Sequence, residues 1–555
     1  MNDSPASSRV PTAAAVSHGV LAPLRTSLFL RIWIASVLSN LGFLFLSVGT
    51  AWEMTALTKA AGMVALVQTA LMLPMTLLSI PAGAIADMYD RRKIALAALA
   101  LSMTSSATLA ILTFMGEASP WMLLAFCALA GTGMTLFNPA WQASVGEQVP
   151  REMLGQAVAL NSISFNIARS FGPALGGVIL AIAGAGITFA STAASYLPMF
   201  GVMYLWRRTP VPSRLPPERI DRAVSAGVRY VLHSPQVRVV LVRTFCFGFG
   251  GSVISALLPL VTRDLLHGSA EIFGLMLGTY GVGAVVGAVG LNRLRHLLSA
   301  EGLILLSTAV LACAVAIVAL SPSVVLSGAA LTIAGAVWMV ALTVCNVQIQ
   351  TMAPRWVSGR LMAAYQTAIG GGMAVGSWCW GGAAQAYSVE LSLLAAAAFL
   401  AATLMLGRFM PVRPAPEVDL EPVKLSDPEV NLALTGRSGP IIVQLDYRVP
   451  AEDARDFYRM MQQVRSVRRR NGGYDWSLSR DVADAELWVE RFQCPTWHDY
   501  LRQRDRNTPD ELEVQMRARR YLRKGTGPQI RRLLERPFGS VRWAEDAPEV
   551  PNSSN

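Results

Sequence analysis

Five charged residues stand close together between two apolar runs, and they are the first candidates for chemistry in this sequence. They are Asp87, Asp90, Arg91, Arg92 and Lys93, within the segment GAIADMYDRRK that begins at Gly83. Carboxylates beside guanidinium groups form charge-assisted hydrogen bonds. Such pairs suit a gate, in which the ion pairs form when it closes and break when it opens. The same residues would also suit a solvated turn between two core helices, or a loop on one side of a membrane.

Arg169 is the second candidate, because it stands inside an apolar run, in the segment NIARSFGPALGG. A charge within a membrane-spanning helix costs about 2.5–3.5 kcal/mol on insertion scales, so an ionisable residue there is a functional candidate by default. An arginine that reaches toward the membrane surface or caps a helix is the structural alternative.

The elements that must position these residues are long apolar helices. The chain of 555 residues is 53% hydrophobic and only 15% charged, whereas a soluble protein carries about 25% charged residues. About 20 apolar residues cross a bilayer as a helix. The sequence predicts twelve such spans: 29–52, 63–86, 94–115, 121–142, 157–181, 187–206, 238–260, 272–291, 302–320, 323–345, 360–385 and 390–410. A soluble core of this size would need many more charged helix faces, so we predict an all-α polytopic membrane protein.

The net charge of +11 does not indicate nucleic-acid binding, because the basic residues follow the spans. They gather after even-numbered spans, at 91–93, 207–229 and 293–295, whereas only Lys59 and Arg263 are obvious after odd-numbered spans. This is the positive-inside pattern, and it predicts a multi-pass protein of the inner (plasma) membrane with both termini in the cytoplasm. Residues 1–27 show no cleaved signal peptide and are expected to be a disordered cytoplasmic tail.

The predicted spans form two halves that repeat one another. Three pairs of residues match at one offset of 204, as in 287 − 83 = 204: Gly83 and Gly287, Pro150 and Pro354, and Gly172 and Gly376. We therefore predict parallel six-helix halves at 28–206 and 237–410, joined by a cytoplasmic linker at 207–236. Apolar residues at helical spacing from Ile220 onward predict an amphipathic helix on the inner leaflet. A disordered linker is the alternative.

Parallel halves of six spans are the arrangement of the major facilitator superfamily, and the charged segment resembles the signature loop of that superfamily between spans 2 and 3. The matching residues are Gly83, Asp87, Arg91 and Arg92. The resemblance implies that Gly83 lets two helices approach closely, and that Asp87 faces the N-terminal end of span 11. The charges would form a latch that closes the inner side and breaks when the halves rock. In the second half Leu291 replaces the aspartate, so a latch there would be weaker.

The segment around Arg169 resembles the G-P-x-x-G-G element of exporting members of the superfamily. The matching residues are Gly172, Pro173, Gly176 and Gly177. Proline interrupts the helix and glycines permit close packing, which predicts a bend pressed against a partner helix. The resemblance implies that this element seals the site against leak. Together the motifs are similar to those of the transmembrane secretion effector branch, which includes enterobactin exporters.

This resemblance implies a secondary active transporter that exports a small amphipathic molecule, a siderophore-like metabolite or a drug, by alternating access and in exchange for protons. No acidic residue is evident in mid-membrane to carry the proton, since Glu53 and Asp264 stand near the outer ends of their spans. No cofactor and no metal site are predicted. Polar residues within the spans are candidate cavity residues, or else interhelical hydrogen-bonding groups: Asn40, Gln68, Asn138, Gln142, Asn161, Asn166, Asn346, Gln348, Gln350 and Gln366.

The remainder of the chain reads as a soluble domain. Residues 411–439 are rich in proline and predict a linker, 440–543 a folded cytoplasmic domain, and 544–555 a disordered tail. IIVQLDYRV alternates as a strand does, helical spacing follows from Phe457, and YDWSLS and ELWVERF alternate again before a second helix at about 496–523. This order is ferredoxin-like. It resembles the antibiotic-biosynthesis-monooxygenase-like domains, which usually pair as dimers.

The soluble domain admits three interpretations. It could oxidise the exported molecule without a cofactor, and the residues to suspect would be Trp476, Trp488, Trp497 and His498. It could instead dock a cytoplasmic partner. We favour core tryptophans and a surface histidine, because nothing in the sequence fixes a base beside a cavity, and we do not expect the domain to be an enzyme.

Overall fold

The computed structural model describes residues 22–145, 148–150, 153–206, 220–354, 356–413, 428, 430–432, 434–523 and 527–535. A short 3-10 helix, η1 (Ala22–Arg25), precedes the first half of the helical bundle. The helices of this half are α1 (Ser27–Leu57), α2 (Ala61–Met88), α3 (Arg91–Met115), α4 (Pro120–Ser144) and α5 (Leu154–Leu205). At Gly184 in α5, φ is 78° and ψ is 176°, which breaks the helix between the predicted fifth and sixth spans.

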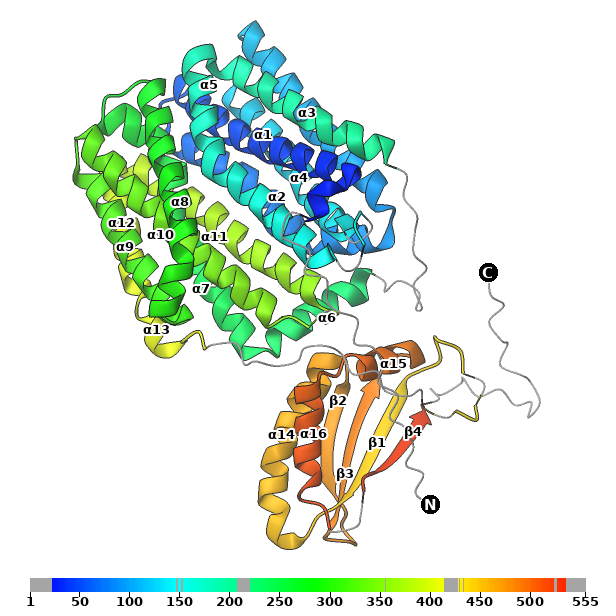
Figure 1. Cartoon of the computed structure of the whole chain (residues 1–555). Helices are drawn as coiled ribbons and strands as arrows, with labels where there is room; N and C mark the ends of the chain where they lie inside the picture. The colour runs from blue at the N-terminus through cyan, green and yellow to red at the C-terminus, as the bar shows by residue number, and fades with distance from the viewer. Residues whose placement is uncertain are drawn as a thin grey trace, which may run out of the picture.

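The second half repeats this plan. Its helices are α7 (Pro235–Leu260), α8 (Ala270–Leu297), α9 (Ala300–Leu320), α10 (Val324–Thr351), α11 (Ser358–Ala386), α12 (Val389–Thr403) and the short α13 (Leu406–Phe409). A π-helical turn, η4 (Val261–Leu265), extends α7. Figure 1 shows the two halves side by side as one bundle of long helices.

Twelve spans are present in the described residues, as predicted. Ten helices are long and apolar enough to cross a membrane, and α5 among them contains two spans. The twelfth span is α11, which is less apolar because glycines, serines and Arg360 are spread along it. The fold class predicted from the sequence is therefore confirmed.

The internal repeat reappears in the packing of the two halves. A Cβ built on Gly172 of α5 would lie 2.7 Å from Leu44 of α1. A Cβ built on Gly376 of α11, the matching position, would lie 2.4 Å from the carbonyl oxygen of Phe249 of α7. Each half therefore presses its fifth helix against its first at a glycine, where small residues let the helix backbones approach.

A helix and a second domain lie at one end of the bundle. The helix is α6 (Ile220–Leu232), within the segment where an amphipathic helix was expected. It contacts α2 in the first half, α7 and α11 in the second, and α14 of the soluble domain. We call this end of the bundle the tail end, and Figure 1 shows the soluble domain beside it.

The soluble domain, which we call the tail, is an α+β unit. Its elements are β1 (Ile441–Arg448), the 3-10 helix η5 (Ala451–Asp453), α14 (Ala454–Asn471), β2 (Tyr474–Arg480), β3 (Leu487–Cys494), α15 (Trp497–Asp505), α16 (Pro509–Arg519) and β4 (Gln529–Leu534). The strands form an antiparallel sheet in the order β2-β3-β1-β4, with Ile441 opposite Cys494 and Leu534. Phe457, Met461 and Val464 of α14 pack on this sheet as the core.

Two details of the tail differ from the sequence prediction. The second helix is divided into α15 and α16, because Thr508 caps a new helix: its hydroxyl accepts from the amide of Glu511, whose carboxylate accepts from the amide of Thr508. Such a capping box starts a helix even where helical spacing continues across it. The fourth strand, β4, was not predicted. Five of its six residues are exposed, and its sequence shows no alternation of apolar and polar residues.

Candidate functional site

The charged segment is a tight turn between two long helices. Asp87 belongs to the last turn of α2, and its side chain lies outside the described structure. Asp90 is the N-cap of α3, and its carboxylate accepts from the amide of Arg92 at 2.9 Å. The Arg92 Nε donates to the carbonyl of Met203 at 2.9 Å, at the end of α5. Arg92 therefore ties the start of α3 to the end of the sixth span.

The close helix approach expected at Gly83 is not found. A Cβ built there would meet no heavy atom of the described residues within 4 Å. The tight contacts between α2 and α11 lie further from the tail end: a Cβ on Gly370 would lie 2.6 Å from Met75, and one on Gly381 would lie 2.3 Å from Ala65. The expectation was wrong for this conformation because α2 and α11 press together along their other portions.

The glycines of the G-P-x-x-G-G element lie in two helix contacts. Gly172 and Gly176 face Leu44 and Phe45 of α1, within the first half. Gly177 faces the other half: a Cβ on it would lie 2.5 Å from the Cα of Gly274 in α8. The predicted packing against partner helices is thus present, and Gly177 contributes to the surface along which the two halves meet, which we call the seam.

The seam also holds polar and aromatic contacts away from the tail end. Thr69 of α2 donates to the carbonyl of Ala374 of α11 at 2.9 Å, and Arg263 donates to the carbonyl of Thr55 at 3.2 Å. The rings of Trp52 and Phe273 stack with centroids 5.2 Å apart. These contacts join the halves from the middle of the bundle to the end opposite the tail.

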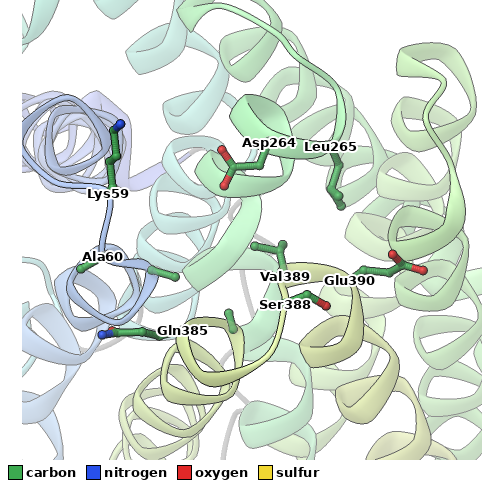
Figure 2. A pocket seen from close by; sticks show the side chains of 10 residues that line it. Lys59, Ala60, Asp264, Leu265, Gln385, Ser388, Val389 and Glu390 are labelled. Atoms are coloured by element: carbon green, nitrogen blue, oxygen red, sulfur yellow. The ribbon is translucent and has the colours of Figure 1, made fainter.

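A cavity of about 380 Å³ opens at that opposite end (Figure 2). Lys59 and Asp264 line it from the two halves, and Gln385 and Glu390 complete its polar rim. The Gln385 side chain accepts from the amide of Gly62 at 3.1 Å, which fixes one wall across the seam. Arg263 pairs with Asp264 at 2.6 Å. We call this cavity the vestibule; it lies at the end of the seam opposite the tail.

Arg169 lies on α5 in the middle of the seam. Its guanidinium carbon is 6.0 Å from the centroid of the Trp338 ring, on α10 of the other half. Tyr280 of α8 and Tyr365 of α11 are close enough to interact with it electrostatically. Among the described residues, no carboxylate and no hydrogen-bond acceptor is found for its guanidinium group. The aromatic partners were missed from the sequence because an aromatic residue within an apolar span reads as core.

The candidate cavity amides do not form one network. Gln68 of α2 is buried, Asn40, Asn138 and Gln366 are half-buried, and Gln142 is exposed. Within the part of the chain that the structure describes, none of these five has a hydrogen-bond partner. Gln350 donates to Asn346 one turn earlier on α10. The side chain of Asn166 lies outside the described residues.

An ion pair that the sequence did not reveal joins α7 to α9. Arg243 and Glu301 are 3.0 Å apart, and their side chains are 4% and 17% exposed. The second oxygen of Glu301 accepts from the amide of Val412 at 2.8 Å, where the chain leaves the bundle. This pair fixes the start of the linker to the tail. The available signal was a pair of opposite charges, one in the seventh predicted span and one just before the ninth.

The residues suspected of oxygenase chemistry each have a structural contact. Trp476 donates to the buried Glu490 at 3.0 Å, Trp488 packs edge-on against Phe457, and Trp497 packs on Tyr500. His498 lies against Gly436, and its partial burial together with nearby Arg502 lowers the pKa of the imidazole. Burial also raises the pKa of the Cys494 thiol to about 12, so this cysteine is a poor nucleophile.

The tail contacts the bundle through arginine–aromatic stacks. The guanidinium carbon of Arg506 is 4.2 Å from the ring centroid of Trp356, just before α11. Arg470 lies 5.7 Å from the ring of Tyr230 on α6. The two rings pack edge to face, with centroids 5.6 Å apart. We call these four residues the tail dock. Hydrogen bonds within the tail fix both arginine side chains. Arg506 donates to the carbonyl of Asn471, and Arg470 donates to the carboxylate of Glu511.

Comparisons with known proteins agree with this geometry. The sequence model of the family described as transmembrane secretion effector matches residues 18–538. The staphyloferrin A transporter of Staphylococcus aureus (strain NCTC 8325 / PS 47) is 26% identical over 287 residues, 51% of this chain and 71% of that protein. The enterobactin exporter EntS of Shigella boydii serotype 18 is 27% identical over 316 residues, 54% of this chain and 71% of that protein.

Solved structures show the same fold at low identity. A bacterial homologue of the human lysosomal transporter Spinster, in an inward-facing and unoccupied conformation, matches 71% of this chain and 99% of its own, with 14% identity and a TM-score of 0.54. The D-xylose–proton symporter matches 67% of this chain and 97% of its own, with 14% identity and a TM-score of 0.54. The helical bundle is thus a major facilitator fold.

Proposed function

Because the chain belongs to the transmembrane secretion effector family, we propose that it exports a small amphipathic molecule, a siderophore-like metabolite or a drug, across the inner membrane. The relatives named above are a transporter of one siderophore and an exporter of another. The observation that carries the proposal is the seam, where two parallel six-helix halves meet around Arg169, for which the described residues supply no carboxylate. Sites at the interface between repeats are where such transporters bind their substrates.

The packing of the seam supports alternating access as the transport mechanism. Gly177 against Gly274, Gly381 against Ala65 and the Trp52–Phe273 stack join the halves from mid-bundle to the opposite end. Rocking the halves about this seam would open the vestibule and close the tail end. At the tail end, Asp87 and the arginines of the α2–α3 turn would form the latch of the closed state.

The tail end is the cytoplasmic side in this proposal, so both termini are cytoplasmic and the vestibule opens outward. The basic residues after even-numbered spans support this orientation. Protons entering through the vestibule would drive export by exchange, with the carboxylates of Glu53 and Asp264 at that end as the groups to test. A periplasm-active phosphatase fused at Asn555 is expected to be inactive, and an active fusion would contradict the orientation.

The export itself is tested by comparing culture media. A strain lacking this gene is expected to release less of at least one small amphipathic metabolite than its parent, and to accumulate it inside. Complementation with the full chain should restore release. Identical media and identical cell contents, under conditions in which the parent makes the protein, would contradict the proposed function.

A second function is supported for the tail, namely docking on the transporter's own inner face. The tail dock joins α14–α16 to α6, the helix between the halves, and to the residue that precedes α11. The two halves contain a complete pathway without it, so deletion of residues 440–555 is expected to reduce export rather than abolish it. Complete loss of export at normal membrane levels would show that the tail takes part in the transport step.

A further inference from the structure

Arg169 is a permanent positive charge placed where the two halves meet. It projects from α5 toward Trp338 of α10, so the cation of one half faces an aromatic ring of the other. Tyr280 and Tyr365 bring two more aromatic rings from the second half near it. The Tyr365 hydroxyl is already engaged, because it donates to the carbonyl of Leu342 at 3.0 Å. The Trp338 ring is thus the aromatic contact that the guanidinium makes across the seam.

The fold does not require a charge at this position. The repeat supplies the comparison, since Met373 of α11 occupies the matching place in the second half (373 − 169 = 204). The neighbouring glycines pack alike in both halves, at Gly172 and Gly376. An arginine that replaces a methionine in the same packing position, and finds no acceptor among the described residues, is left with unused hydrogen-bond donors.

Those donors select a particular kind of ligand. A guanidinium group is planar and presents parallel N–H donors that match the two oxygens of a carboxylate or of a similar planar anion. In a site of low dielectric, an unpaired cation favours an anionic ligand and disfavours a cationic one. An aromatic ring such as that of Trp338, which the Arg169 guanidinium faces, is a flat apolar surface against which another aromatic ring packs.

We infer that Arg169 binds an anionic oxygen group of the transported molecule, and that Trp338, Tyr280 and Tyr365 pack against an adjoining aromatic ring. The substrate class is therefore an aromatic or otherwise flat organic acid. The assignment rests on the proposed export function and makes it more specific. Binding of the anion replaces the cation–aromatic contact between the halves, which links occupancy of the site to the strength of the seam.

The test measures binding to the purified full-length chain, without transport. The probes are salicylate and its neutral carboxamide, salicylamide, which share a ring and differ in charge. We expect the wild type to bind salicylate roughly ten- to hundred-fold more tightly than salicylamide, as for a hydrogen-bonded charge. Arg169→Met should abolish this preference, and Arg169→Lys should retain part of it. Arg295→Met, which removes an exposed charge at the end of α8, is the matched control and should bind as the wild type does.

A second variant separates the charge from the ring. Trp338→Leu should weaken binding of salicylate while keeping its preference over salicylamide, because Arg169 remains. Elution of every variant as a monodisperse protein establishes folding. Equal binding of the two probes, retention of the preference in Arg169→Met, or no binding of salicylate would each overturn the inference. The proposed function stands apart from this result, since a cationic or neutral metabolite missing from the deletion medium would support export and contradict an anion site.

Discussion

Two arginines on helices, the half-buried Arg169 in the seam and the buried Arg468 in the tail, differ in what surrounds them. The Arg468 Nε is 3.1 Å from Glu490, whose side chain is fully buried. The same carboxylate accepts from the Tyr447 hydroxyl at 2.6 Å and from Trp476 at 3.0 Å. Arg169 faces the Trp338 ring and has no carboxylate partner among the residues that the structure describes. One arginine completes a network, and the other leaves its donors unused.

The difference separates a structural charge from a functional one. A buried charge is tolerated when its partner and hydrogen bonds offset the loss of water, and such a network then specifies one packed core. Within the described part of the chain, the partner of Arg169 is a cation–aromatic contact of about 0.5–2 kcal/mol, which is smaller than an insertion cost of about 2.5–3.5 kcal/mol. The remainder must be offset by water or by a ligand, which is what a transport site requires.

The largest effect on stability is expected from the paired arginine. Glu490→Gln keeps the size of the side chain but leaves Arg468 as an unpaired buried charge, so we expect the tail to lose about 3–5 kcal/mol. Hydrogen exchange of β1 and β3 in the full-length protein measures this loss. The control is Glu513→Gln, whose partner is Arg517 and whose pair is 47% exposed on both sides, with an expected effect of about 0–1 kcal/mol. Equal effects of the two changes would remove the contrast.

At Gly177, we expect added side-chain volume to weaken the seam and reduce export. In Gly177→Ala the added carbon would lie 2.5 Å from the Cα of Gly274, a backbone atom, so α5 and α8 must move apart. Overpacking of this kind costs about 1–3 kcal/mol, and we expect export to fall several-fold because the closed seam is weakened. Gly201→Ala is the control, because its added carbon meets nothing within 4 Å. Export in vesicles, normalised to protein level, should distinguish them, and equal export would show that the seam is not closed here.

The tail dock is expected to have a smaller effect. Arg506→Ala removes the stack on Trp356, a contact of about 0.5–2 kcal/mol. We expect amides of α6 to exchange several-fold faster with solvent and export to be reduced. Trp356→Ala should do the same, and the double variant should add little. Arg517→Ala, an arginine of the tail that pairs with Glu513, should leave α6 unchanged. Unchanged exchange in Arg506→Ala would mean that the Arg506–Trp356 stack does not hold α6.

The smallest effects concern the α2–α3 turn. Asp90→Asn should be nearly neutral, because asparagine caps a helix as well as aspartate does and the amide of Arg92 keeps its acceptor. Asp87→Asn should impair export more, because the proposed latch places the Asp87 carboxylate at a helix N-terminus, an interaction of about 0.3–1 kcal/mol. Export rates of both variants, measured side by side at equal membrane levels, check this. Equal rates would reduce the segment to a signal for topology.

The spans and their repeat could be predicted because apolar length and a fixed offset are properties of the sequence itself. The contact of Gly177 with Gly274, and of Arg169 with Trp338, could not, because each joins the two halves and depends on how they are rotated. The motif at Gly83 could be recognised in the sequence. Its helix contacts could not be predicted, because they depend on the conformation of the bundle. In the tail, Glu490 was hidden because a charged residue in an alternating strand reads as solvent-exposed.

The most direct test of the central claim, that Arg169 serves transport and not folding, is export by the Arg169→Met variant. Transport is measured in vesicles with the metabolite identified from the culture media, normalised to inserted and folded protein. We expect Arg169→Met to be inserted and folded as the wild type is, because Met373 fills the matching position of the repeat, and to lose export. Arg169→Lys should recover only part of it, because lysine keeps the charge without the planar donors. Normal export by Arg169→Met would contradict the account, and the substrate site would then have to be sought among the asparagine and glutamine residues of α1, α4 and α10.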